Sequence, residues 1–358
     1  MSNVNEIKLR IALKAYWSCL LRVVFIPLRP ISGLDNAMSG TVKTFGTLSR
    51  AEFILPNLGS LIMGLAWGAT PSTGLGDLAI RIVLSFAIIN LSSAIGAQAN
   101  TLSDRELDSR DARKKQLVEA MRVFGANRLK KVIAAEIALT LFLVLLFMLI
   151  LQKPILLLLW TVGICLGCAY SLAPLRLKSR SWLAPVSLIL VLAFFPVLFA
   201  YYTFTAEMNP FFLMSLTGLA LTVYGVIIPT ETRDYFGDKA MNIETFTVHL
   251  GLVKASITAT ALLTTGAALT AIAFLLEFAY SQHLFLSIIL IAIPASGFVV
   301  LKQFRKLYSL SKEYALLESS SVEEKIVDLS AHNPQWIMII TQTYSAISII
   351  LLVSKFWL

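Results

Sequence analysis

Long apolar segments recur along most of this chain, and short polar segments separate them. Each apolar segment has about 20 residues, the length that an α-helix needs to cross the hydrocarbon core of a bilayer. Nine such segments can be placed, at roughly residues 51–69, 79–99, 132–152, 154–173, 182–202, 211–230, 254–276, 283–301 and 335–354. The pattern predicts an all-α polytopic membrane protein with about nine transmembrane helices.

The N-terminal residues 1–45 follow a different pattern. Four basic residues interrupt the apolar positions there: Lys8, Arg10, Lys14 and Arg22. The segment lacks the charged, apolar and cleavage-site order of a signal peptide. We therefore expect residues 1–45 to lie in the cytoplasm or at the membrane interface as an amphipathic segment. Residues 46–358 would form the transmembrane domain.

Composition agrees with a membrane protein, because 57% of the residues are hydrophobic and only 14% are charged. The net charge of +9 is explained by membrane orientation and by contact with anionic lipid headgroups. Membrane lipids are therefore expected partners. Nucleic acid is not, because no soluble basic domain is present to offer a binding groove. The three histidines are scattered, and Cys165 and Cys168 form a Cys-Leu-Gly-Cys pair within an apolar segment that we interpret as small residues for helix packing rather than as a redox or metal pair, so no zinc or haem site is predicted.

The basic residues also predict the orientation of the chain. With the N-terminus inside, only Arg81, Lys153 and Lys355 fall on the outer side, and the other 27 of the 30 basic residues fall on the inner side. Lys and Arg concentrate on the cytoplasmic side of membrane proteins. We expect an integral, multi-pass protein of the cell membrane whose polar inner loops face the cytoplasm.

Two acidic sets follow the second and the sixth apolar segments. The first set is Asn100, Asp104 and Asp108, and the second is Glu231, Asp234 and Asp238. In a helix, each set would share one face, where like charges repel. Carboxylates at a membrane boundary are costly. Such sets suit Mg²⁺, which binds through carboxylates, water and substrate phosphate oxygens.

The acidic residues could instead be solvated loop charges that pair locally with Arg105, Arg110 and Arg233. Their occurrence at the inner ends of two corresponding segments favours the metal interpretation. Magnesium ions at the two sets would then hold a diphosphate between them.

A basic cluster follows the fourth segment and consists of Arg176, Lys178 and Arg180. These residues could be ordinary inner-side flanking charges. They could also bind a diphosphate and the pyrophosphate that leaves it. Tyr170, just before them, is either an aromatic anchor at the membrane interface or a polar group that lines a pocket.

Three segments together resemble the UbiA superfamily of membrane prenyltransferases. Asn100-x-x-x-Asp104-x-x-x-Asp108 is similar to the first signature of that family, and Asp234-x-x-x-Asp238, with the Thr245 that follows, to the second. The segment Tyr170-Ser-x-x-Pro-x-Arg-Leu-Lys178 resembles the family sequence after the fourth span. The likeness covers roughly residues 48–355.

The resemblance implies a helical bundle around a central cavity that is open sideways to lipid. Family members transfer an isoprenyl chain from a polyprenyl diphosphate donor to a hydrophobic acceptor, with Mg²⁺ at both acidic motifs. By position, Asn100, Asp104 and Asp108 would serve one metal site, and Asp234 and Asp238 the other, with Glu231 beside them. The four aspartates would be the catalytic residues. Contact with the diphosphate would come from Asn100, Tyr170, Arg176 and Lys178.

The chain departs from the family pattern at three places. Thr101 stands where many members have Asp, Asn242 stands where Gly is common, and the loop at residues 109–118 contains no proline. The altered loop leaves the acceptor open. The acceptor could be aromatic, a quinone precursor or lipid-like. Alternatively, the protein could be a membrane terpene cyclase that uses no external acceptor.

A membrane transporter is a third hypothesis from a different class. Transporters carry ionisable residues near the middle of their spans. Here Glu136 lies near the start of the third segment, and the other carboxylates gather at one interface. The sequence therefore favours an enzyme.

Overall fold

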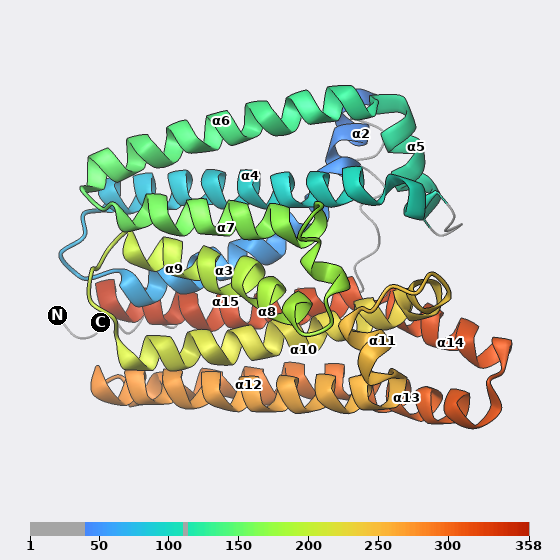
Figure 1. The fold of residues 1–358 in the computed structure, drawn as a ribbon. Coiled ribbons are helices and arrows are strands. Elements are labelled where there is room, and N and C mark those ends of the chain that lie inside the picture. The colour runs from blue at the N-terminus through green and yellow to red at the C-terminus, as the bar shows by residue number, and fades with distance from the viewer. Residues whose placement is uncertain (1–39, 110–113, 358) are drawn as a thin grey trace. The chain divides into compact units, whose positions relative to one another are not determined.

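The computed structural model describes residues 40–109 and 114–357, and the regular elements in these residues are all helices (Figure 1). Gly40–Leu358 makes up one compact unit of the chain. The expected interfacial segment at residues 1–45 falls mostly outside the described residues. Its last residues belong to the short helix α2, Gly40–Leu48.

The helices follow one another with short connections. In chain order they are α2 (Gly40–Leu48), η1 (Ala51–Phe53), α3 (Ile54–Gly68), α4 (Leu75–Asp108), α5 (Lys115–Phe124), α6 (Ala126–Leu151), α7 (Ile155–Ser171), η3 (Leu177–Ser179), α8 (Leu183–Ile189), the π-helical turn η4 (Leu190–Phe194), α9 (Phe195–Tyr202), α10 (Pro210–Ala240), α11 (Phe246–Leu250), α12 (Leu252–Tyr280), η5 (Leu284–Ile291), α13 (Ala292–Leu317), α14 (Ser320–Ala331) and α15 (Asn333–Trp357).

Seven helical segments in the described residues are long and apolar enough to cross a membrane. They are Gly76–Glu106, Ala126–Leu151, Leu183–Tyr202, Pro210–Ala240, Leu252–Tyr280, Leu284–Leu317 and Ser320–Phe356. Helix α7 is a shorter apolar helix, and α3 coincides with the first predicted span. The prediction of an all-α polytopic membrane protein is confirmed, and the count of nine spans is approximate.

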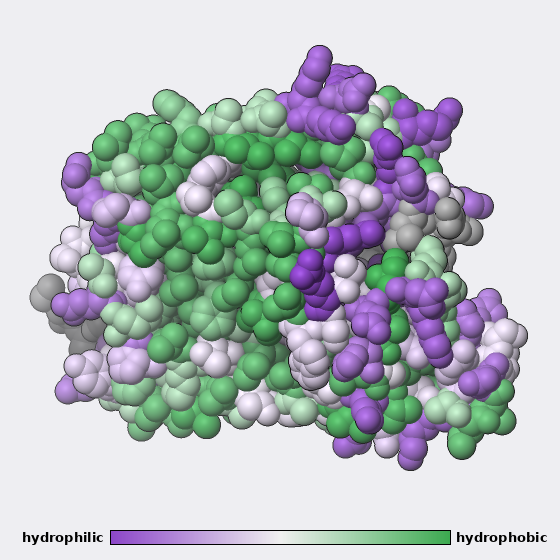
Figure 2. All heavy atoms as spheres, viewed as in Figure 1, coloured by the Kyte–Doolittle hydropathy of each residue, from purple (hydrophilic) through white to green (hydrophobic). Residues whose placement is uncertain are grey.

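The surface agrees with burial in lipid. Figure 2 shows a broad hydrophobic face on the bundle, with hydrophilic residues gathered toward the end where α4 and α10 finish. Large apolar side chains on several helices are exposed, among them Phe142, Leu149, Leu158 and Ile288. Soluble proteins rarely expose apolar patches of this extent, so lipid is the expected surrounding.

Helices α4 and α10 are longer than a membrane span. Helix α4 has 34 residues and α10 has 31, which correspond to lengths of about 51 Å and about 46 Å. The hydrocarbon core is only about 30 Å thick. The two helices run in the same direction in Figure 1 with other helices between them, and their C-terminal turns reach the same end of the bundle. Those turns carry the two acidic sets.

The start of α10 is fixed by its sequence. The Asn209 side chain accepts hydrogen bonds from the backbone N–H groups of Phe211 at 2.8 Å and Phe212 at 3.2 Å. Pro210 occupies the first helical position, where its missing N–H costs nothing. This N-cap sets the register with which α10 delivers its carboxylates at the other end.

Small residues bring α10 and α12 into close backbone contact. A methyl group at Gly218 would lie 2.7 Å from the carbonyl oxygen of Gly266 on α12. At Gly225 a methyl group would lie 2.8 Å from the backbone nitrogen of Leu263. Close approach at small residues is the usual way in which membrane helices associate, because dispersion contacts replace the missing hydrophobic effect.

Candidate functional site

The acidic set on α4 is buried and paired with cations from another part of the chain. Asp104 is 7% exposed and Asp108 is 4% exposed. The Lys178 ammonium donates to the Asp104 carboxylate and lies 3.3 Å from Oδ1 of Asn100. A guanidinium nitrogen of Arg176 lies 3.4 Å from Oδ1 of Asp104. Arg176 and Lys178 therefore form one ionic cluster with the first acidic set, whereas Arg180 donates to the backbone carbonyl of Leu175.

Side-chain hydrogen bonds attach the segment after α7 to α4. The Ser171 hydroxyl donates to Oδ1 of Asn100 at 2.9 Å, and the Ser103 hydroxyl donates to the backbone carbonyl of Ser171 at 2.7 Å. Arg176 then adopts a left-handed backbone conformation with φ 39°. This turn brings Lys178 back over the end of α4.

Lys114 is a further cation at the site, and the sequence reasoning did not select it. Its ammonium donates to Oδ1 of Asp108 at 2.8 Å. Burial acts to lower the pKa of Lys114, but attraction by Asp234 and Asp108 outweighs burial and raises the pKa above its ordinary value. Lys114 therefore lies within the field of both acidic sets. Its place in the unusual loop after Asp108 was the available signal.

Lys178 is in a different electrostatic balance from Lys114. Burial is the largest influence and lowers the pKa of Lys178, although the neighbouring Asp104 carboxylate acts in the opposite direction. A buried ammonium needs a counter-charge to remain ionised, and Asp104 supplies it.

The acidic set on α10 has fewer partners. The Glu231 carboxylate accepts a hydrogen bond from the Thr247 hydroxyl at 2.8 Å, and the side chain of Arg233 lies 3.2 Å from Asp234. Within residues 40–109 and 114–357, Asp238 makes no ion pair. Its surroundings include Asp234, Lys114, Lys178 and Asp104, so the two acidic sets face one another.

The local-pairing alternative for the acidic residues holds in one of the two parts that the described residues test. Arg233 does pair with the adjacent Asp234. Arg105 lies 3.7 Å from Glu106, which belongs to neither set. Arg110 falls outside the described residues.

Tyr170 lies at the junction of the two sets and lines the main cavity. Carboxylates of both α4 and α10, including Asp104, Glu231 and Asp234, are close enough to Tyr170 to interact with it electrostatically. Of the two interpretations of Tyr170, the structure favours the group that lines a pocket.

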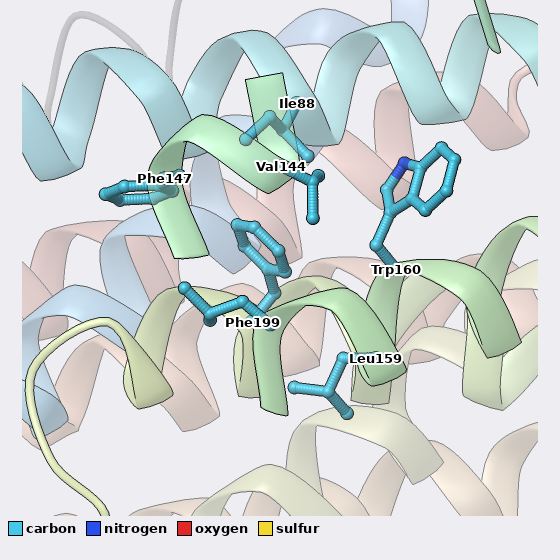
Figure 3. Close-up of a cluster of buried hydrophobic side chains, with 7 residues drawn as sticks. Ile88, Val144, Phe147, Leu159, Trp160 and Phe199 are labelled. Carbon is cyan, nitrogen blue, oxygen red and sulfur yellow. The ribbon is translucent and has the colours of Figure 1, made fainter. Parts of the chain in front are cut away.

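The cavity has a volume of about 330 Å³ and begins at Asn100, Tyr170 and Ser171. From there it extends among α3, α4, α7, η4, α9, α10 and α15 to Trp160 and Phe199. Figure 3 shows these two aromatic side chains in a buried cluster with Ile88, Val144, Phe147 and Leu159. The cavity thus combines a polar end, where Asn100 also contacts Lys178 of the ionic cluster, with an apolar body, and its volume is of ligand-binding size.

The residues at the polar end fit a hard divalent cation together with a polyanion. No three acidic, histidine or cysteine side chains converge as a ready-made metal cage in the part of the chain that the structure describes. Mg²⁺ does not require such a cage, because it takes one or two carboxylates and completes its shell with water and substrate phosphate oxygens. Carboxylate oxygens on α4 and α10, the amide oxygen of Asn100 and the ammonium groups of Lys114 and Lys178 are the donor set for a metal-bound diphosphate.

Solved structures share this architecture. A UbiA homolog from Archaeoglobus fulgidus superposes with a TM-score of 0.56 at 17% sequence identity, covering 86% of this chain and 99% of that one. The same homolog bound to GPP and Mg²⁺ gives a TM-score of 0.56 at 18% identity, with coverages of 83% and 99%. A digeranylgeranylglyceryl phosphate synthase gives 0.55 at 17% identity, with coverages of 87% and 99%. At these identities the likeness shows the fold.

The sequence itself supplies the family. No curated protein matches the chain. The UbiA prenyltransferase family matches residues 57–320, which hold both acidic sets, the basic cluster and most of the helices around the cavity. This protein belongs to the UbiA prenyltransferase family.

Proposed function

We propose that this protein transfers an isoprenyl chain from a polyprenyl diphosphate to a hydrophobic acceptor within the membrane and releases pyrophosphate. The observation that carries the proposal is the pair of facing acidic sets, with Lys114 and Lys178 close to both, at the mouth of an apolar cavity. The family supports prenyl-diphosphate chemistry. Structures of the Archaeoglobus fulgidus homolog bound to GPP or DMAPP with Mg²⁺ add support.

In this proposal, each acidic set contributes to a Mg²⁺ site. Asn100, Asp104 and Asp108 would hold one ion, and Glu231, Asp234 and Asp238 the other. Bound Mg²⁺ supplies positive charge that stabilises the departing pyrophosphate. Lys178, Arg176 and Lys114 add cationic contacts to the diphosphate oxygens. Tyr170 lines the cavity wall beside them.

The reaction conserves atoms and charge as a substitution at C1 of the isoprenyl chain. The bond between C1 and the diphosphate oxygen breaks, and its electron pair leaves with pyrophosphate. A nucleophilic atom of the acceptor forms the new bond to C1, and the proton that it loses leaves with pyrophosphate. The apolar cavity excludes water from the allylic cation. Aromatic faces that line the cavity, such as those of Phe195 and Trp160, stabilise positive charge.

The acceptor is proposed to be aromatic, a quinone precursor or lipid-like, and residues 46–358 form the catalytic domain. The site would face the cytoplasm, as the distribution of basic residues predicts. The alternative is cyclisation of the donor on its own double bonds, which the same metal sites and cavity would allow.

The test is product formation by purified protein in lipid nanodiscs, offered prenyl diphosphates of several lengths and a membrane-lipid extract. Mass spectrometry would identify prenylated acceptors, and a phosphate assay would follow pyrophosphate. We expect Asp104→Ala and Asp234→Ala each to lower pyrophosphate release by about 100-fold or more, because charge on the leaving group loses its stabilisation.

Asp77→Ala is the matched control, because Asp77 is the same residue type at the opposite end of α4 and pairs with Arg81. It should retain activity. Undiminished pyrophosphate release in the Asp104→Ala/Asp234→Ala double variant would refute the assigned roles. A cyclic terpene formed without acceptor would establish the alternative reaction.

A further inference from the structure

The main cavity has two unlike walls. Helix α7, η4 and α9 line one side with apolar and aromatic side chains, including Trp160, Val191 and Phe195. On α3 and α4, four polar side chains line the cavity in addition to Asn100: Asn57, Ser60, Ser92 and Ser93. We name these four residues the serine wall. An isoprenyl tail needs only apolar surroundings, so the serine wall requires a separate explanation.

The hydroxyl groups of this wall are not used by the protein. Across the described residues, Ser60, Ser92 and Ser93 have no hydrogen-bond partner, although Ser60 is only 7% exposed and the Ser92 oxygen is fully buried. Hydroxyls elsewhere in the described helices usually donate to a carbonyl of the preceding turn, as Thr101 does to Ala97 on α4 and Ser256 to Leu252 on α12. A buried hydroxyl without a partner is costly. Ser60 and Ser93 line the cavity with hydroxyl groups that no protein atom in the described residues accepts from or donates to, which indicates a partner that binds there.

Asn57 adds an acceptor to these donors. Its Nδ2 donates to Oδ1 of Asn90 at 3.2 Å, and Nδ2 of Asn90 donates to the backbone carbonyl of Phe86 at 2.9 Å. This chain of hydrogen bonds fixes the Asn57 amide and leaves its Oδ1 as an acceptor at the cavity. The serine wall therefore offers both donors and an acceptor.

The wall is close enough to the diphosphate end for a compact acceptor. Ser93 precedes Asn100 by seven residues, or two turns of α4, so the two lie on one helix face about 10 Å apart. Gly96, between them, also lines the cavity and presents no side chain. This arrangement leaves room along α4 between the serine wall and the position proposed for the reacting carbon.

We propose that the serine wall binds the polar head of the prenyl acceptor, a compact molecule with two or more hydroxyl or carbonyl oxygens. The inference rests on the proposed transferase function and names the acceptor class for the same site. A hydroxylated ring and a glycerol-type head share this chemistry. Unpaired hydroxyls beside an allylic cation would trap it, so the wall also argues for an external acceptor that occupies them rather than for cyclisation.

The test compares acceptor and donor kinetics in full-length protein. The probes are a hydroquinone, its monomethyl and dimethyl ethers, and a glycerol monoalkyl ether, each offered with one prenyl diphosphate. For whichever hydroxylated probe is transferred, Ser60→Ala and Ser93→Ala should each raise the acceptor KM by about three- to tenfold, the contribution of one neutral hydrogen bond. The donor KM should not change. Progressive methylation of the hydroquinone should raise its acceptor KM for the wild type and remove the difference in KM between wild type and variants.

Ser348→Ala is the matched control, because Ser348 carries a buried hydroxyl without a partner but does not line the cavity. Equilibrium binding of tritiated hydroquinone and of labelled glycerol ether without donor gives a second readout, in which Kd should rise by the same factor. Serine-wall variants that behave like Ser348→Ala, or wild-type protein that binds neither probe, would overturn the inference. Absence of pyrophosphate release from any donor would instead refute the proposed transferase function. The binding measurement would then still test whether the serine wall binds a hydroxylated molecule.

Discussion

The ends of α4 and α10 carry similar acidic sets in different electrostatic surroundings. Asp104 and Asp108 on α4 are each paired with a lysine from another segment, Lys178 or Lys114. On α10, the Asp234 side chain is 29% exposed and pairs with its neighbour Arg233. Glu231 accepts from a neutral hydroxyl. The fold therefore neutralises the acidic set on α4 with lysines, whereas it neutralises the acidic set on α10 only in part.

The difference indicates how the two sets would act toward a metal and a diphosphate. Carboxylates that already hold ammonium groups must exchange or share them when a ligand arrives. Carboxylates without such partners repel one another until a cation binds. We infer that the acidic set on α10 binds a divalent cation more strongly, whereas the lysines paired with the acidic set on α4 bind the diphosphate.

The largest expected effect is the loss of stability in Asp104→Asn. This change removes the nearest counter-charge of the buried Lys178 ammonium, which costs about 3–5 kcal/mol. Unfolding in detergent without metal, followed by tryptophan fluorescence, would measure it. The double variant Asp104→Leu/Lys178→Met removes both charges and should recover most of the loss. Asp238→Asn should not cause this loss of stability, because it relieves repulsion between carboxylates. Equal destabilisation by Asp238→Asn would contradict the difference between the acidic sets of α4 and α10.

A smaller effect is expected in metal affinity, where the change on α10 should matter more than the change on α4. Asp238→Asn should weaken Mg²⁺ binding by at least about tenfold, because it replaces a carboxylate that no ammonium already holds by a neutral amide with a single oxygen. Asp104→Asn should weaken binding less, since Lys178 neutralises that carboxylate before the metal arrives. Titration with Mn²⁺ followed by paramagnetic resonance would provide the affinities. A larger loss in Asp104→Asn than in Asp238→Asn would contradict this assignment.

The smallest effect is expected at Arg176, whose side chain is 38% exposed and lies 3.4 Å from Asp104. Exposed pairs of this kind contribute less than about 1 kcal/mol. Arg176→Gln should therefore change the free energy of unfolding far less than Lys178→Gln, although both remove one positive charge near Asp104. Chemical denaturation of the two variants under the same conditions tests this. Similar losses would mean that burial does not distinguish these two cations.

Much of the fold followed from the sequence because lipid imposes a simple rule on the chain. Runs of about 20 apolar residues can only be helices there. The spacing of Asp104 and Asp108, and of Asp234 and Asp238, also placed each pair on one helix face, and the structure has each pair within a single helix. Helices α4 and α10 continue beyond the predicted ends at residues 99 and 230, because polar residues outside the lipid can still extend a helix.

Contacts between distant segments could not be read from spacing. Lys114 approaches Asp108 and Asp234 because the chain turns back after α4, and no periodic pattern records that turn. Thr247 reaches Glu231 across the short connection after α10. The serine wall is also invisible in the sequence, because a serine that bonds to its own helix and one that faces a cavity look alike there.

The glycine contacts between α10 and α12 have a mechanical consequence. Gly218 and Gly266 allow the two backbones to touch only in one register, and a shift by one residue would bring a side chain into the same space. Helices α10 and α12 therefore behave as a rigid pair within the bundle. Carboxylates carried by α10 would keep their positions while substrates enter and products leave.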